Sequence, residues 1–247
     1  MGEQTQEIRD QLLDAALLHV VFDGWSETSF KAAVDDSGID PALAMALFPR
    51  GALDLALAYH KRGDEVMKTR LAATDLTQMR FRDRVALAVR YRLEAAEDKE
   101  AVRRGATLFA LPTHAAEGAK LVWGTADAIW NALGDTSEDA NWYSKRATLS
   151  GVYSATVLFW LGDDSADHQA TWDFLDRRID NVMQIETLKA SAQKNPLLKP
   201  FLAGPNFLAS LVRKPTSVDD LPGRWTQSGM GTGGMGAGGM GPDSAAE

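Results

Sequence analysis

The sequence predicts an all-α protein, built from a helix-turn-helix unit of three helices followed by a larger helical bundle. Three observations lead to this prediction. Apolar residues recur at the three- and four-residue spacing of helices along most of the chain. No segment alternates as a half-buried strand does, and we find no Asn-Gly or Asp-Gly hairpin between apolar runs. Residues that start and stop helices also divide the chain into segments of helical length.

The first 50 residues have the layout of a helix-turn-helix unit. A first apolar stripe predicts a helix that ends near Gly24, and a Ser-Gly turn at 37–38 separates two shorter helices. Asp40 followed by Pro41 predicts the start of the third helix. An aspartate side chain accepts hydrogen bonds from free backbone N–H groups, and proline fits the first helical turn. We therefore expect three packed helices over 1–50.

Six longer helices follow and form the predicted bundle of residues 51–194. Segment 152–161 is apolar nearly all round, which predicts a central buried helix. The periodicity of the apolar residues and the breaks between the periodic segments give the expected ranges 51–73, 77–97, 99–110, 113–133, 139–161 and 166–192.

The composition changes after residue 194. Segment 195–214 is apolar, carries Lys and Arg at its edges and is divided by prolines. It either closes the bundle or forms a membrane-binding amphipathic segment, and both interpretations stay open. Segment 215–247 is rich in Gly and Met, which predicts disorder. In the membrane-binding interpretation, the contacting residues are Phe201, Leu202, Phe207, Leu208, Leu211 and Val212.

Charge argues against binding to nucleic acid. The chain has a net charge of −8, and residues 1–50 hold three Lys and Arg against nine Asp and Glu, a net charge of −6. A polyanion repels such a surface. The expected recognition helix, Pro-Ala-Leu-Ala-Met-Ala-Leu-Phe over 41–48, offers no polar side chain for base or phosphate contacts.

The sequence contains no recognisable catalytic constellation. It has no cysteine, which excludes disulfides, thiolate metal sites and thiol catalysis. The four histidines form no Glu-x-x-His or His-x-x-x-His pair, and none neighbours a nucleophile-elbow serine. The N-terminus does not resemble a signal or transit peptide, and no apolar run reaches the roughly 18 residues of a membrane-spanning helix. We expect a soluble non-enzyme without metal or cofactor, with a peripheral membrane role left open.

One tryptophan has an unusual neighbourhood. Trp142 stands beside Tyr143 at an expected helix start, among charged and polar residues. Such an aromatic pair is often partly exposed, and exposed Trp, Tyr and Arg side chains dominate protein–protein interfaces. An interface and core packing are equal alternatives for Trp142, whereas core packing is the interpretation for Trp172.

Two motifs resemble the coenzyme Q (ubiquinone) biosynthesis accessory lipid-binding family of mitochondria and alphaproteobacteria. The first, Asn-Trp-Tyr-Ser-Lys-Arg-Ala over 141–147, corresponds to that family's Asn-Trp-Tyr-x-Arg-Arg-Ala. The second, Thr-Trp-Asp-Phe-Leu over 171–175 with Arg178 and Met183, corresponds to its Thr-Trp-x-Phe-Leu and the Arg and Met that follow. With further matches in the same order, the resemblance covers approximately residues 8–185.

The resemblance implies a TetR-repressor-like fold that has lost DNA binding, a homodimer, and a cytoplasmic location peripheral to the bacterial inner membrane. It also implies a docking surface for the demethoxyubiquinone hydroxylase. Lys145 departs from the family's arginine, and it keeps the charge but not the bidentate geometry. The residues at positions of the docking motif are Asp139, Asn141, Trp142, Tyr143, Lys145 and Arg146.

The resemblance further implies an apolar pocket for an isoprenoid or quinone lipid or a phospholipid. A polyprenyl chain outside a bilayer exposes apolar area at about 25 cal/mol per Å², and a helical pocket lowers that cost without any catalytic group. We expect a non-catalytic protein that presents the quinone precursor to the hydroxylase. The alternatives are a ligand-responsive TetR-type transcriptional regulator and an enzyme of unknown type. Helical phase assigns the pocket lining to Leu121, Ile129, Trp130, Val152 and Trp160.

Overall fold

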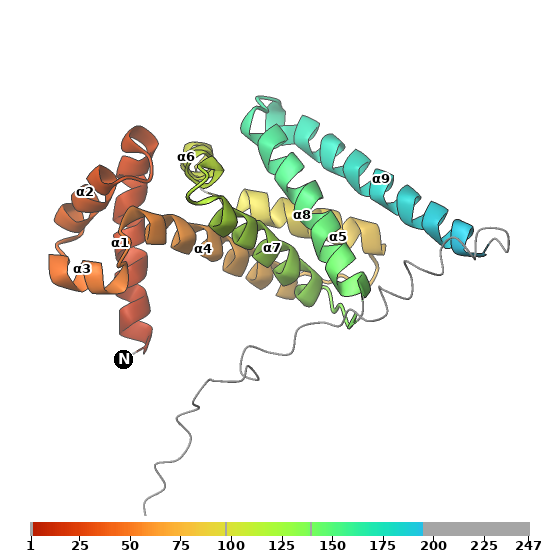
Figure 1. Ribbon diagram of the computed structural model, residues 1–247, viewed down its shortest axis with the longest axis horizontal. Helices are drawn as coiled ribbons and strands as arrows, with labels where there is room; N and C mark the ends of the chain where they lie inside the picture. Colours follow the sequence, from red (N-terminus) through yellow and green to blue (C-terminus); the bar gives the residue numbers. More distant parts are fainter. Residues whose placement is uncertain (1, 97, 139, 195–247) are drawn as a thin grey trace, which may run out of the picture. The chain divides into compact units, whose positions relative to one another are not determined.

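The computed structural model describes residues 2–96, 98–138 and 140–194. These residues form nine α-helices and one short 3₁₀ helix, and they contain no strand (Figure 1). The all-α prediction is therefore confirmed. The helices are α1 (Gly2–Asp23), α2 (Glu27–Ser37), α3 (Pro41–Leu47), α4 (Ala52–Ala72), α5 (Phe81–Glu94), α6 (Lys99–Ala110), α7 (Ala115–Ala132), α8 (Ala140–Leu161), η1 (Ala166–His168) and α9 (Gln169–Lys194).

Helices α1, α2 and α3 form the predicted helix-turn-helix unit. Gly38 ends α2 with a φ of 65°, a left-handed conformation that glycine adopts without a Cβ clash. Asp40 caps α3 by accepting hydrogen bonds from the backbone N–H groups of Ala42 at 2.9 Å and Leu43 at 3.1 Å. The predicted helix start at Asp40 and Pro41 is confirmed. Apolar faces of the three helices and of α4 meet in one core, which includes Leu12, Leu13, Ala16, Val20, Phe30, Phe48 and Leu55.

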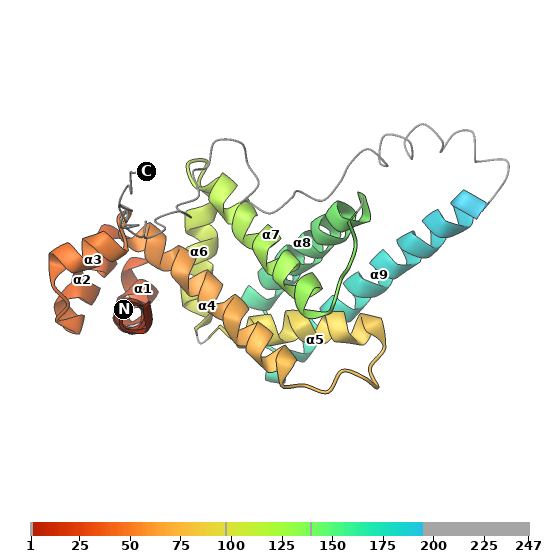
Figure 2. The same cartoon turned by 90° about the horizontal axis from the view of Figure 1, so that it is seen from below.

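The remaining helices build a second core. Helices α7 and α8 pack together, α8 packs on α9, and α4 lies against α5 and α7 (Figures 1 and 2). Trp172 is 9% exposed in this core, as predicted. Helix α6 also reaches the N-terminal unit, because Trp25 Nε1 donates a hydrogen bond to the Ala101 carbonyl oxygen at 3.1 Å. The buried residues of this core include Met67, Val89, Ile129, Leu149, Tyr153, Trp160 and Leu175.

Two expectations from periodicity differ from the structure. The helix expected over 166–192 divides into η1 and α9, because Asp167 and His168 have φ values of 50° and 56°, outside the helical region. Segment 152–161 is not buried all round, since Leu158 is 66% and Phe159 is 38% exposed. This prediction was wrong because apolar composition does not show which face of a helix a neighbour covers.

The predicted segments 195–214 and 215–247 lie outside the described residues. Within the described part of the chain, no single helix has the length and hydropathy needed to cross a membrane. Helices α3 and α4 pass that test only as a pair, and they are bent by 59° at the break between them.

Candidate functional site

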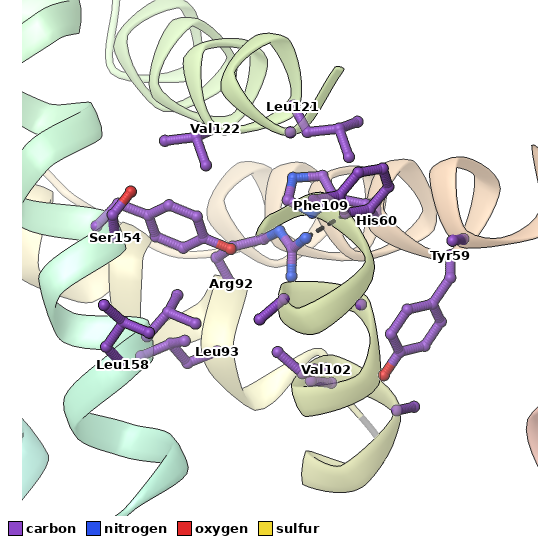
Figure 3. Close-up of a pocket in the computed structure, with 18 of the residues that line it drawn as sticks. Tyr59, His60, Arg92, Leu93, Val102, Phe109, Leu121, Val122, Ser154 and Leu158 are labelled. Carbon is purple, nitrogen blue, oxygen red and sulfur yellow. Dashed lines mark hydrogen bonds between the residues drawn. The ribbon is translucent and has the colours of Figure 1, made fainter. Parts of the chain in front are cut away.

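An apolar cavity of about 300 Å³ lies among α4, α5, α6, α7 and α8. Figure 3 shows side chains from all five helices around it, with Leu121 and Val122 of α7 facing Val102 of α6 and Leu158 of α8. Binding pockets for small molecules are commonly about 300–1,000 Å³ and mostly apolar. The cavity is therefore large enough for a small apolar ligand or for part of a long one.

Small residues on α6 and α7 leave the space for this cavity. Gly105, Ala106 and Ala110 lie on α6, and Gly118 lies on α7. A Cβ at Gly118 would stand 2.7 Å from the Cβ of Phe109, closer than side chains approach in proteins. Glycine at this position lets α6 and α7 approach each other beside the cavity.

One wall of the cavity is polar and is organised around Arg92. Arg92 is 6% exposed, and its Nε donates a hydrogen bond to Asp64 Oδ1 at 2.6 Å. Its Nη2 donates to the His60 carbonyl oxygen at 2.9 Å (Figure 3). A Cβ at Gly63 would meet Arg92 Nη1 at 2.5 Å, so the guanidinium packs against the bare backbone of α4. This buried charge is thus paired with a carboxylate and hydrogen-bonded.

His60 also belongs to the polar wall, and the fully buried Thr125 side chain contacts it. The two side chains are 2.8 Å apart between His60 Nε2 and Thr125 Oγ1, and Thr125 Oγ1 also lies 2.8 Å from Asp64 Oδ1. Burial lowers the pKa of His60 to about 3, and the positive charge of Arg92 acts in the same direction. His60 is therefore uncharged at neutral pH.

The five residues expected to line a lipid pocket do not lie in one place. Leu121 and Trp160 line the cavity. Trp130 and Val152 instead line a second pocket of about 250 Å³ between α5, α7, α8 and α9. Ile129 is fully buried in the core. Helical phase identified buried residues but did not distinguish the cavity from the rest of the core.

The polar wall was not predicted from the sequence. His60 and Asp64 stand four residues apart on α4, a spacing that places them on one face of a helix. This spacing was the available signal. Arg92 and Thr125 come from α5 and α7, and no local pattern connects them to α4.

The docking motif has a buried arginine at its centre. Arg146 is 0% exposed and lies over the Trp142 ring, with its Cζ 4.1 Å from the ring centroid. Its Nε donates to Asp127 Oδ1 at 2.5 Å, and its Nη1 donates to Asp135 Oδ2 at 3.0 Å. A third bond joins Arg146 Nη2 to Asn131 Oδ1 at 3.2 Å. Arg146 thus fastens the start of α8 to α7 and to the loop that follows α7.

Lys145 extends this network toward the surface. Its Nζ donates to Asp135 Oδ1 at 2.8 Å and to Ser137 Oγ at 2.6 Å. Although burial alone would raise the pKa of Asp135, hydrogen bonds from Lys145, Ser137 and Arg146 hold this pKa well below its usual value. Asp135 is therefore ionised at neutral pH and bound by two cations.

Of the two alternatives left open for Trp142, the structure favours core packing, because Trp142 is only 8% exposed. Its ring packs on Tyr143 at a centroid distance of 4.8 Å and on Trp123 at 5.9 Å. Asn141 is exposed and Tyr143 is half-buried, whereas Asp139 lies outside the described residues. The surface around the motif therefore presents Asn141, Tyr143 and part of Lys145, and the docking role of these residues stays a prediction.

Some other expectations cannot be placed on the structure. The six expected membrane-contacting residues between 201 and 212 lie outside its described part. Among the residues it describes, no three His, Asp or Glu side chains gather as metal ligands would.

Comparison with known proteins identifies relatives of the chain. Residues 115–186 match the family described as COQ9. The chain is 30% identical over 191 residues to the mitochondrial ubiquinone biosynthesis protein COQ9 of Drosophila melanogaster, covering 75% of this chain and 58% of that relative. It is 26% identical over 194 residues to the human protein of the same name, covering 74% of this chain and 60% of the relative. The chain thus spans about three-fifths of these relatives' length. The resemblance to the coenzyme Q biosynthesis accessory family is confirmed.

The fold also matches a solved structure. The TetR transcriptional regulator from Nitrosomonas europaea superposes with a TM-score of 0.60 at 18% sequence identity, covering 70% of this chain and 97% of the regulator. This likeness confirms the predicted TetR-like fold. At such low identity it shows the fold alone.

Proposed function

Starting from the match of residues 115–186 to the COQ9 family, we propose that this protein is a non-catalytic accessory factor of ubiquinone biosynthesis. In this proposal it binds an isoprenoid lipid in the cavity and presents the quinone precursor to the demethoxyubiquinone hydroxylase. The observation that carries the proposal is the apolar cavity of about 300 Å³ among α4, α5, α6, α7 and α8. Since a lipid of this kind gains free energy by leaving water, a carrier needs such a cavity and no catalytic group.

Filling the cavity tests lipid binding. Ala106 lines the cavity, so Ala106→Phe places a ring in the space that the lipid would take. We expect native mass spectrometry to detect a copurifying isoprenoid, quinone or phospholipid on the unmodified protein, and to detect much less on this variant. Ala119→Phe on the exposed face of α7 is the matched control and should keep the lipid. Absence of lipid from the unmodified protein would contradict the proposal.

The surface beside Trp142 is the proposed docking site for the hydroxylase. A change at Trp142 itself is a poor test, because this ring is buried against Arg146 and its loss also disturbs the fold. Asn141→Arg and Tyr143→Ala change the surface more directly. We expect both variants to lose coprecipitation of the hydroxylase while their circular dichroism stays unchanged. Arg177→Ala, an exposed change on α9, should retain the enzyme. Retention by all three variants would contradict this docking site.

A homodimer is also part of the proposal. Its support is the apolar surface of α8, where Phe159 is 38% exposed and stacks on Phe174 at a centroid distance of 4.5 Å. Exposed apolar patches of this kind mark association surfaces. Sedimentation should show a dimer for the unmodified protein and a monomer for Phe159→Glu. A monomeric unmodified protein would be the contrary result.

The surface of α3 supports the proposed loss of DNA binding. Its outward side chains include Leu43 and Met45, which are 41% and 48% exposed and offer neither charge nor hydrogen-bond donors to a base edge. A salt-sensitive, sequence-specific gel shift would instead favour the transcriptional regulator.

A further inference from the structure

Two side chains that line the cavity, Arg92 and Tyr153, each have a donor group that makes no hydrogen bond to a described residue. Arg92 uses Nε and Nη2 for its hydrogen bonds, which leaves Nη1 without one in the described part of the chain. The Tyr153 hydroxyl likewise has no hydrogen-bond partner there. Arg92 is 6% and Tyr153 is 4% exposed, and both line the cavity. The otherwise apolar cavity therefore contains a polar corner, defined here as Arg92 Nη1 and the Tyr153 hydroxyl.

Arg92 and Tyr153 are neighbouring side chains on the wall of the cavity. The Arg92 guanidinium stands 5.9 Å from the centroid of the Tyr153 ring. Buried polar groups in proteins are nearly always hydrogen-bonded, because their lost hydration is otherwise uncompensated. A ligand oxygen placed in the polar corner would supply the missing acceptor. An all-hydrocarbon ligand would leave both donors unsatisfied.

The charges around the polar corner favour an uncharged oxygen. Asp64 already pairs with Arg92 at 2.6 Å, so the positive charge at this wall is balanced by a carboxylate. His60 is uncharged at neutral pH, because burial lowers its pKa to about 3. A phosphate or carboxylate in the cavity would be desolvated and would also face the Asp64 carboxylate. A carbonyl or hydroxyl oxygen meets neither penalty.

We propose that the polar corner binds the oxygen-bearing end of the lipid. A carbonyl oxygen of a prenylated ring, or the hydroxyl oxygen of a prenyl alcohol, accepts hydrogen bonds from Arg92 and Tyr153, while the tail packs on Val102, Leu121 and Trp160. The inference rests on the proposed function, since it takes for granted that the cavity binds a lipid. It adds the orientation of that lipid and a preference for an uncharged oxygen.

Ligands with one tail and different ends test the inference on the full chain. The reporter is a benzoquinone with two isoprene units, whose binding quenches the fluorescence of Trp25 and Trp160 in the cavity wall. Farnesol, farnesene and farnesyl phosphate then compete with the reporter. We expect farnesol to bind at least about fivefold more tightly than farnesene or farnesyl phosphate, the effect of roughly one net hydrogen bond.

Tyr153→Phe removes one donor and keeps the ring in the core. This variant should bind farnesol about five- to tenfold more weakly and farnesene as before. Tyr91→Phe is the matched control, because the Tyr91 hydroxyl lies 3.2 Å from Thr74 Oγ1 and does not line the cavity. The control should leave all three affinities unchanged.

The contrary outcomes separate this inference from the proposed function. Equal binding of farnesol and farnesene to the unmodified protein would overturn the inference and leave lipid binding intact. So would an unchanged farnesol affinity in Tyr153→Phe. Tighter binding of farnesyl phosphate than of farnesol would overturn the preference for an uncharged oxygen. If neither the quinone nor any farnesyl compound binds, the proposed function itself fails.

Discussion

Replacing Arg146 by methionine should destabilise the fold strongly, although the position belongs to the expected docking motif. The Arg146 side chain is fully buried and forms ion pairs with Asp127 and Asp135. Methionine retains much of the apolar stem but removes the guanidinium. Asp135, whose side chain is only 3% exposed, then loses one of its two cations, and the Trp142 ring loses the cation above it.

The size of this effect follows from the burial of the partners. Breaking a buried ion pair by removing one partner typically costs about 3–5 kcal/mol, because the other charge stays uncompensated. Two features reduce this cost. Asp127 is 36% exposed and regains water, and Asp135 keeps Lys145. We expect a loss of about 2–4 kcal/mol in the free energy of unfolding, which lowers Tm by roughly 5–15 °C in a domain of this size.

Chemical and thermal unfolding of three variants measures this effect. Lys145→Met in the same motif should lose less than about 1 kcal/mol, because Lys145 is 37% exposed and Asp135 keeps Arg146. Arg177→Met on the exposed face of α9 should change stability by less than about 0.5 kcal/mol. A loss below about 1 kcal/mol for Arg146→Met would refute the structural role that we assign to this side chain.

Three further predictions concern the polar wall of the cavity. The folded protein holds the pKa of His60 at about 3, below its ordinary value of 6.5, so the unfolded chain binds a proton first as the pH falls. The stability that comes from keeping His60 neutral is fully present above pH 6.5 and is lost progressively toward pH 3. Between pH 7 and pH 5 the free energy of unfolding should therefore fall by about 1–2 kcal/mol. The fall should be less steep in His60→Gln, and equal slopes for the two proteins would contradict the prediction. Gly63→Ala should destabilise the fold by about 1–3 kcal/mol, because the new alanine Cβ would meet Arg92 Nη1 at 2.5 Å. An unchanged urea midpoint would show that the Arg92 side chain moves aside freely. Thr125→Val, at a fully buried position, should lower the free energy of unfolding by about 1–2 kcal/mol, because it removes a hydroxyl that lies 2.8 Å from both His60 and Asp64. An unchanged stability would mean that His60 and Asp64 are hydrogen-bonded well enough without this hydroxyl.

Local signals in the sequence were sufficient for most of the helices. The Asp40 cap and Pro41 fix the start of α3, and these depend only on neighbouring residues. The apolar periods gave the range of α6 correctly and those of α4 and α7 to within two residues. The helix break at Asp167 and His168 was not predicted, because it depends on a backbone conformation that neither residue type requires.

Exposure around Trp142 could not be inferred in the same way. The polar neighbours of Trp142 in the sequence left a surface position and a core position open as equal alternatives. In the fold, Arg146 turns inward over the ring because α7 and the following loop supply Asp127 and Asp135. A charged side chain near a tryptophan indicates exposure only when its counterions are absent, and these counterions stand 11 and 19 residues away in the chain.

The sequence by itself determined the all-α class, the helix-turn-helix layout and the family resemblance, because each depends on the order and spacing of residues along the chain. Only the tertiary structure decided which apolar residues leave a cavity between them and which fill the core. It alone brought Arg92, Asp64 and Thr125 from three helices into one hydrogen-bonded group. Helical periodicity reports that a face is buried, whereas a cavity and its polar corner depend on what the neighbouring helices place opposite that face.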